Sequence, residues 1–242
     1  MCTVTFIPVK DGFFITSNRD EKKQRTRALP PDTYRLNNID LLFPRDADAG
    51  GTWIALKDQA NAAVLLNGGF VFHFSKPPYR RSRGLILLDI LSAADPANFF
   101  SLMNLKSIEP FTLILFQDAK LFECRWDGEQ KHCTELAVNK SHIWSSATLY
   151  NEAISKKRET WFKDWLSKYT EPTQEDIFNF HQFAGDGDIQ NDIRMNREGN
   201  LFTVSITGIH LEKNNALMSY FDLKDGSRYN NKTANAIAYS IS

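Results

Sequence analysis

The sequence predicts an α+β protein in which antiparallel sheets are covered by helices. Pairs of strand-like segments joined by tight polar turns lie near both ends of the chain, and helical patterns gather in two blocks between them. Strands that follow one another through short turns pair antiparallel, and the apolar face of each sheet needs a covering layer. We therefore expect a layered sandwich.

The first half of the chain contains two predicted hairpins. Residues 2–9 and 13–17 are rich in valine, threonine, phenylalanine and isoleucine, and Asp11-Gly12 between them is a strong turn signal. A second pair of strands is expected at 52–58 and 61–69. After a basic loop, KPPYRRSRG, the apolar spacing that starts at Leu85 predicts a helix ending near Asp95-Pro96.

The second half begins with a predicted meander of three strands over residues 111–136. Apolar residues at helical spacing predict helices over 151–169 and 175–183, and strands return at 201–209 and 216–223. The remaining element is a polar tail with a weak final strand, residues 230–242.

Composition limits the classes of function. The chain has 242 residues, of which 42% are hydrophobic, and this suffices for one domain over 1–242. Lysine plus arginine equals aspartate plus glutamate at 29 each, so no global field favours nucleic acid. No apolar run approaches the roughly 18 residues that span a bilayer, and no leader pattern is present. We expect a cytoplasmic protein without stable membrane insertion.

Three cysteines make an odd count, and none has the C-x-x-C spacing of a metal or redox site. Cys124 and Cys133 lie in an alternating segment where they can face each other across a hairpin, and in a reducing compartment we expect them to be thiols. The five histidines form no H-x-x-x-H pair, so no metal site is expected.

Cys2 is the informative cysteine because it follows the initiator methionine. A thiol attacks as its thiolate, and an ordinary cysteine with a pKa of about 8.5 needs a neighbouring base. If Met1 is removed, the free α-amine of Cys2, with a pKa of about 8, can accept the proton from its own side chain. The competing interpretation is a small buried strand residue, the usual role of a free cysteine.

The segment NRDE lies across the first predicted turn from Cys2. There Asp20 is placed to hydrogen-bond the α-ammonium, Arg19 to lower the pKa of the thiol, and Asn18 to orient a substrate. A shift of one residue in the hairpin register would exchange the faces, so the facing side stays open at this stage.

Asn67 ends the fourth predicted strand and precedes two glycines, where backbone N–H groups become accessible. It is a candidate donor to an oxyanion. The alternative is that Asn67 only adopts a left-handed turn conformation.

The opening MCTVTFIP followed by FFITSNRDE resembles the NRDE family of transport and Golgi organisation proteins. GGTWIAL at 50–56 and LLNGG at 65–69 support the resemblance. The family is similar in outline to the choloylglycine and penicillin V acylases of the amino-terminal nucleophile superfamily. The resemblance implies a four-layer αββα sandwich of antiparallel sheets, in agreement with the α+β class expected from the residues.

Carried over by this resemblance, Cys2 matches the acylase nucleophile, Asn18 and Asp20 match an Asn-x-Asp pair, and Asn67 matches the oxyanion asparagine. The resemblance thus assigns catalytic positions on both predicted hairpins.

Two positions depart from the acylase pattern. The arginine that those enzymes place before the asparagine is Ser17 here, with Arg19 as the nearby substitute. A later asparagine falls on Ser145 or Ser146, which weakens the expected oxyanion hole.

The leading functional hypothesis is hydrolysis of a small-molecule, non-peptide C–N amide through Cys2 without any cofactor. The alternative is a non-catalytic carrier of haem or an acyl lipid, because NRDE proteins have been linked to haem mobilisation and lipid metabolism. His73, among aromatic residues and just before several arginines, is the candidate haem ligand.

Overall fold

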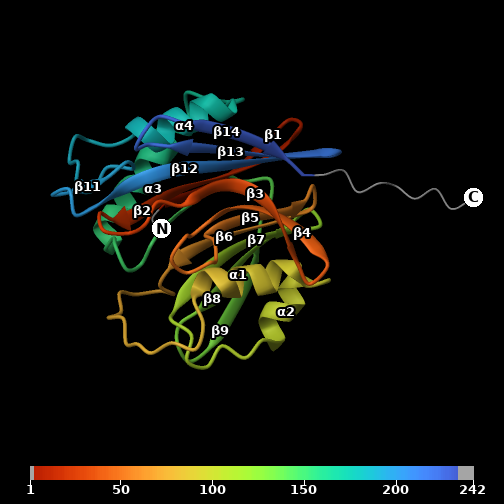
Figure 1. Ribbon diagram of the computed structural model, residues 1–242. Helices are drawn as coiled ribbons and strands as arrows, with labels where there is room; N and C mark the ends of the chain where they lie inside the picture. The colour runs from red at the N-terminus through yellow and green to blue at the C-terminus, as the bar shows by residue number, and fades with distance from the viewer. Residues whose placement is uncertain (1–2, 234–242) are drawn as a thin grey trace, which may run out of the picture.

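The computed structural model describes residues 3–233 and consists of two seven-stranded antiparallel sheets and four helices within that range (Figure 1). Cys2, the residue on which the nucleophile hypothesis depends, lies outside the described residues. So does the part of the predicted polar tail beyond residue 233.

The first sheet has the strand order β10-β1-β2-β12-β13-β14, with β11 paired to β12. Its strands are β1 (Thr3–Val9), β2 (Gly12–Lys22), β10 (His142–Ser145), β11 (Asn196–Arg197), β12 (Leu201–Glu212), β13 (Asn215–Asp222) and β14 (Arg228–Lys232).

The second sheet runs in sequence order from β3 to β9. Its strands are β3 (Leu29–Leu36), β4 (Ile39–Arg45), β5 (Ile54–Asp58), β6 (Asn61–Asn67), β7 (Phe111–Gln117), β8 (Lys120–Trp126) and β9 (Lys131–Leu136). The helices are α1 (Arg83–Ser92), α2 (Pro96–Leu102), α3 (Glu152–Leu166) and α4 (Gln174–Phe183).

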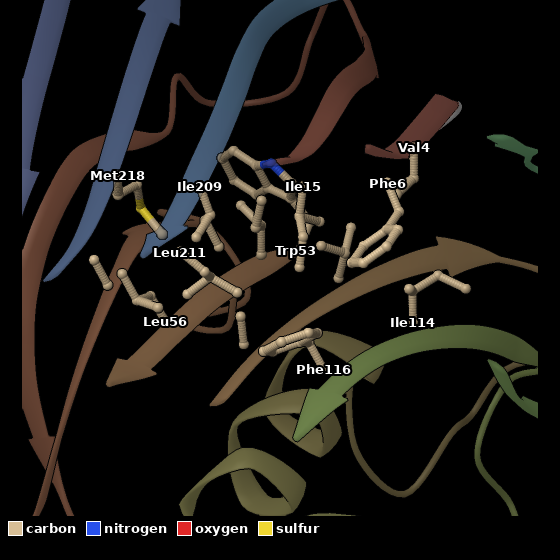
Figure 2. Packing of buried hydrophobic residues seen from close by; sticks show 14 of the residues in the cluster. Val4, Phe6, Ile15, Trp53, Leu56, Ile114, Phe116, Ile209, Leu211 and Met218 are labelled. Atoms are coloured by element: carbon tan, nitrogen blue, oxygen red, sulfur yellow. The ribbon is translucent and has the colours of Figure 1, made fainter. Parts of the chain in front are cut away.

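The elements stack in four layers. Helices α3 and α4 cover the outer face of the first sheet, and α1 and α2 cover the outer face of the second (Figure 1). The two inner faces meet in a large apolar core, where Ile209 of β12 and Phe116 of β7 come together (Figure 2). The αββα sandwich of antiparallel sheets expected from the sequence is confirmed.

The pleat of β1 and β2 divides their side chains between two cores. Val4, Phe6 and Ile15 point into the core between the sheets, whereas Ile7 and Phe14 pack against α3 and α4. Successive side chains of a strand point to opposite faces, so each position of this hairpin belongs to one core or the other.

The predicted first hairpin, the meander and the two helices expected over 151–169 and 175–183 are present. In the hairpin, Thr3 lies opposite Asn18 and Val9 opposite Gly12. The meander places Cys124 directly opposite Cys133, with the two sulfur atoms 2.9 Å apart. Both are free thiols. The hydrogen bond to Cys133 and burial raise the pKa of Cys124, so Cys124 keeps its proton.

The hairpin β3–β4 was not expected, because prolines interrupt the sequence there. β3 is the edge strand of its sheet, and its ladder shifts register between Leu29 and Asp32, at Pro30-Pro31. Proline is tolerated at an edge or a bulge, where no ladder hydrogen bond is lost. The turn is formed by Asn37 and Asn38, which both have positive φ, as a two-residue hairpin turn requires.

The helix expected to end near Asp95-Pro96 ends earlier, at Ser92, and α2 begins at Pro96. The Asp95 side chain accepts a hydrogen bond from the backbone N–H of Asn98, so it caps α2. Aspartate at the N-cap followed by proline is a start signal for a helix, so Asp95-Pro96 marks the beginning of α2 and not the end of α1.

Two glycines let α1 approach the second sheet closely. A Cβ atom on Gly51 would lie 2.6 Å from the backbone carbon of Gly84, and one on Gly84 would lie 2.6 Å from the carbonyl oxygen of Thr52. Real Cβ atoms do not come this close to backbone, so these positions require glycine. The contact holds the beginning of α1 against the loop that precedes β5.

We predict that Gly84→Ala destabilises the protein by about 2 kcal/mol, because the new methyl group must push α1 away from Thr52. Urea unfolding followed by circular dichroism measures the change. Gly226→Ala is the comparison variant, since its Cβ would meet no atom within 4 Å and its loss of stability reports the strain of a positive φ alone. Equal stability of Gly84→Ala and wild type would contradict the close approach.

Candidate functional site

A cavity of about 460 Å³ opens at the end of the sandwich where β2 and β6 end. Its wall is built from β2, the loop between β4 and β5, the end of β6 and the segment that leads into α1. Both sheets therefore contribute to the cavity, as does the close contact between the start of α1 and the loop before β5.

Arg19 of β2 forms one side of this cavity and is only 4% exposed. Its guanidinium lies 2.8 Å from the carboxylate of Asp46 and 3.4 Å from that of Glu21. It also lies 4.6 Å from the centre of the Trp53 ring, within cation–π range. Two carboxylates and an aromatic face thus compensate the buried positive charge.

Asp46 is the hub of this ion-pair network. Its carboxylate accepts hydrogen bonds from Arg19 at 2.8 Å, Arg25 at 2.9 Å and the backbone N–H of Ala49 at 2.8 Å. Burial favours the neutral acid, but these donors and the two arginine charges outweigh it and hold the pKa of Asp46 below its ordinary value. The carboxylate is therefore ionised at neutral pH and fixes Arg19 in place.

The opposite wall comes from the basic loop. Arg83 pairs with Glu109 at 3.1 Å, and Glu109 also lies 3.5 Å from the imidazole of His73. Burial lowers the pKa of Arg83, and Glu109 acts in the opposite direction. Together with Arg81, the cavity is lined by four arginines and three carboxylates.

Asn67 lies at the end of β6 and lines the same cavity. Its carbonyl oxygen accepts a hydrogen bond from the Ser146 hydroxyl at 2.9 Å. The left-handed conformation in this turn belongs to Gly68, with φ of 84°, and Asn67 does not share it. The alternative interpretation, that Asn67 is needed only for a left-handed turn, is therefore wrong.

The beginning of β1 lies close to Asn67. Thr3 pairs with Ser145 of β10 on one side and with Asn18 of β2 on the other. Ser146, the residue after β10, bonds to Asn67 in the second sheet. Ser145 and Ser146, the two candidate positions for the acylase asparagine, thus connect the start of β1 to the end of β6.

Asn18 points away from the cavity, toward α4. Its amide group donates hydrogen bonds to the carbonyl oxygens of His181 at 3.1 Å and Ile193 at 2.9 Å. Its oxygen lies 2.6 Å from Nδ1 of His181, so Nδ1 is the donor. Nε2 of His181 then accepts from the Thr5 hydroxyl at 2.8 Å. Burial, aided by Arg158, lowers the pKa of His181 to about 3, which matches this neutral tautomer.

Asp20 is buried on the same face as Asn18. Its two carboxylate oxygens accept hydrogen bonds from Tyr150 at 3.1 Å and from Thr203 at 2.6 Å. The Tyr150 ring lies 3.6 Å below the guanidinium of Arg158, which donates to the Thr3 hydroxyl at 2.5 Å. A polar network therefore runs behind the first sheet from Asp20 to the start of β1.

The structure brings together two of the predicted site residues, Arg19 and Asn67, at one cavity. Asn18 and Asp20 lie on the other face of the first sheet, because odd and even positions of β2 alternate. Ser17 is an odd position like Arg19, so the Arg19 guanidinium lies on the same face of β2 as Ser17.

Arg158 is a buried charged residue that sequence reasoning missed. Its helix was expected, but no role was assigned to Arg158 itself, and it is fully buried. Its position relative to Ile154, Trp161 and Trp165 follows the spacing of the apolar stripe of that helix. A charged residue within an apolar stripe was the signal available.

A family model described as Transport and Golgi organisation 2 matches residues 1–234. The chain belongs to this family. Comparison of the sequence with curated proteins found no match.

Solved structures of similar fold include two hydrolases. An N-acylethanolamine-hydrolyzing acid amidase ortholog from Caenorhabditis elegans is 12% identical, with a TM-score of 0.61 over 86% of this chain and 92% of that one. A mutant conjugated bile acid hydrolase from Clostridium perfringens is 11% identical, with a TM-score of 0.60 over 96% and 92%. At such low identity, this similarity establishes the fold of the amino-terminal nucleophile hydrolases.

Within residues 3–233, no group of three or more histidine, cysteine, aspartate or glutamate side chains is arranged to hold a metal ion. In the same range every helix is too short or too polar to cross a bilayer.

We predict that stability falls as the pH drops from about 6.5 toward 3, in part because His181 gains a proton in the unfolded state only. The stabilisation from neutral His181 is complete above about pH 6.5. His181→Gln removes this titration, so its loss of stability in that window should be shallower. Urea unfolding at a series of pH values measures both slopes, and identical slopes would contradict a neutral buried imidazole.

Proposed function

We propose that this member of the family hydrolyses a non-peptide C–N amide bond, with Cys2 as the nucleophile after removal of Met1. The observation that carries the proposal is the cavity where β2 and β6 end, which is lined by the buried Arg19 and by Asn67. The fold shared with an acid amidase and a bile acid hydrolase supports it.

The alternation of side chains along β1 supports Cys2 as the nucleophile. The even-numbered residues Val4 and Phe6 of β1 face the space between the sheets. We propose that Cys2, the preceding even-numbered position, follows the same alternation. Thr3 pairs with Asn18 of the neighbouring strand β2. The next residue of β2, Arg19, lies on the face between the sheets.

The chemistry then follows from one residue and its surroundings. The α-amine takes the thiol proton, the thiolate attacks the carbonyl carbon, and the carbonyl oxygen becomes an oxyanion. Asn67 donates a hydrogen bond to this oxyanion. The ammonium returns the proton to the leaving nitrogen as the C–N bond breaks. Water then attacks the acyl thioester, releases the acid and restores the thiol.

Arg19 favours the thiolate by its positive charge, which Asp46 keeps in place. Asp20 accepts one hydrogen bond on each oxygen, and a carboxylate has further acceptor sites. We assign one of these to the α-ammonium. The excess of one arginine over the carboxylates in the cavity favours an amide with an anionic group.

The direct test is a panel of N-acyl amides assayed with wild type, Cys2→Ala and Asn67→Ala. We expect wild type to release acid and amine, Cys2→Ala to be inactive, and Asn67→Ala to lose roughly 100-fold in kcat. The matched control is Asn98→Ala, since Asn98 is exposed on α2. It should retain the wild-type rate.

The intact mass of the purified protein shows whether Met1 has been removed, and this measurement needs no substrate. We expect the mature protein to lack Met1. Retained Met1 would block the α-amine, and equal rates from wild type and Cys2→Ala would end the proposal.

The alternative proposal is a carrier of haem or an acyl lipid, which the arginines near α1 support because they can pair with carboxylates. The described cavity lining offers Tyr79 as a haem ligand but no histidine, cysteine or methionine. His73 lies outside that lining, with Nε2 3.5 Å from Glu109. These residues do not form a preformed axial site, so we rank the carrier second.

Titration with hemin tests the carrier. If the protein carries haem through His73, micromolar hemin will give a shifted Soret band that His73→Ala abolishes and His132→Ala retains. No shift at micromolar hemin would exclude haem as the cargo.

A further inference from the structure

We propose that residues 70–76, here called the aromatic loop, dock the protein reversibly on an anionic lipid surface. The loop connects β6 to the segment before α1 and projects from the body of the sandwich at the side of α1 (Figure 1). Docking requires no chemistry at Cys2, so this proposal stands independently of amide hydrolysis.

The loop concentrates exposed apolar side chains. Phe70, Val71, Phe72 and Phe74 are 54%, 72%, 56% and 76% exposed. Other large exposed apolar residues in the described range lie singly or as pairs along other elements. Single exposed apolar residues are ordinary on a protein surface, whereas four within five positions mark an interaction site.

Contacts to the body hold the loop in one arrangement. Phe70 packs against the edge of His132, with centroids 4.9 Å apart, and under the guanidinium of Arg125 at 4.9 Å. His73 turns inward to Glu109. Phe72 and Phe74 contact each other edge to face, with centroids 4.9 Å apart. The loop is thus anchored by two residues and displays the others to solvent.

The second half of the loop and the residues that follow it are also fixed. The backbone N–H of Lys76 donates to the Tyr79 hydroxyl at 2.7 Å, and that of Arg80 donates to the carbonyl oxygen of Ser107 at 2.9 Å. An apolar surface held in this way incurs little ordering cost when it binds.

The positive charge next to the aromatic loop favours an anionic lipid surface as the partner. The sequence contains no acidic residue between Asp58 and Asp89, and Lys76, Arg80 and Arg81 follow the aromatic residues directly. All three are exposed, and Arg81 is also paired with Asp89 at 2.9 Å, so Lys76 and Arg80 contribute most of the positive charge. Phenylalanine side chains enter the boundary of headgroups and acyl chains, and adjacent basic residues are attracted to anionic headgroups. The overall charge is neutral, so this attraction is local to the loop.

The aromatic loop lies between residues that line the cavity. Tyr79 and Arg81, which follow the aromatic loop, line the cavity wall, as does Asn67 before it. A protein docked through this loop would hold the cavity rim near the lipid. A membrane is favoured over a protein groove because basic residues follow the exposed phenylalanines with no acidic residue among them.

The test is co-sedimentation of the full chain with vesicles of phosphatidylcholine alone or with about one third phosphatidylglycerol. We expect binding to the anionic vesicles that weakens as salt is raised. Phe72→Ser/Phe74→Ser should weaken partitioning by roughly 100-fold, since each phenylalanine contributes about tenfold. Lys76→Glu should weaken it several-fold on anionic vesicles only.

The matched control is Phe183→Ser. Phe183 is 72% exposed at the end of α4, on the helical layer of the other sheet. This variant should bind vesicles like wild type. Circular dichroism and thermal unfolding verify that every variant is folded.

Three results would overturn the proposal. One is wild type that stays in the supernatant with anionic vesicles at low salt. Another is equal loss of binding by Phe183→Ser and by Phe72→Ser/Phe74→Ser. The third is a wild-type dimer that Phe72→Ser/Phe74→Ser converts to a monomer in size-exclusion chromatography, since the surface then serves a second copy of the chain.

Discussion

The pleat of β2 is the constraint on which the rest of the site depends. It sends Arg19 toward the space between the sheets and Asn18 and Asp20 toward the helices. A slip of one residue in the pairing with β1 would exchange these faces and bury the wrong polar groups on each side. The bonds that Asn18 makes to α4 therefore also fix the orientation of the cavity arginine.

Buried polar groups are satisfied differently on the two sides of this strand. On the helix side, His181 stays neutral and is matched donor to acceptor by Asn18 and Thr5. On the cavity side, Arg19 keeps its charge and is matched by Asp46 and the Trp53 face. A rigid hydrogen-bonded network behind a charged cavity wall gives the wall a fixed geometry, which site chemistry requires.

Family membership and fold similarity do not by themselves assign an activity, because one fold hosts many reactions. The features that distinguish this chain are local. Arg19 supplies a guanidinium on the face of β2 to which Ser17 belongs. The Ser146 hydroxyl donates a hydrogen bond to the backbone carbonyl of Asn67, near where acylases are expected to place an asparagine. The aromatic loop, residues 70–76, adds an exposed apolar surface near the cavity.

The sequence by itself determined the first hairpin, the meander and the helices over 151–169 and 175–183, because turn residues and apolar periodicity act over a few positions. It also indicated the family, through the resemblance of its opening motif. It could not decide the edge strand at Pro30-Pro31, since tolerance of proline depends on which strands lie beside it. Nor could it show that Arg158 is buried or that Arg19 and Asn67 share a cavity. Those facts depend on residues far apart in the chain, which only the packing of the two sheets brings together.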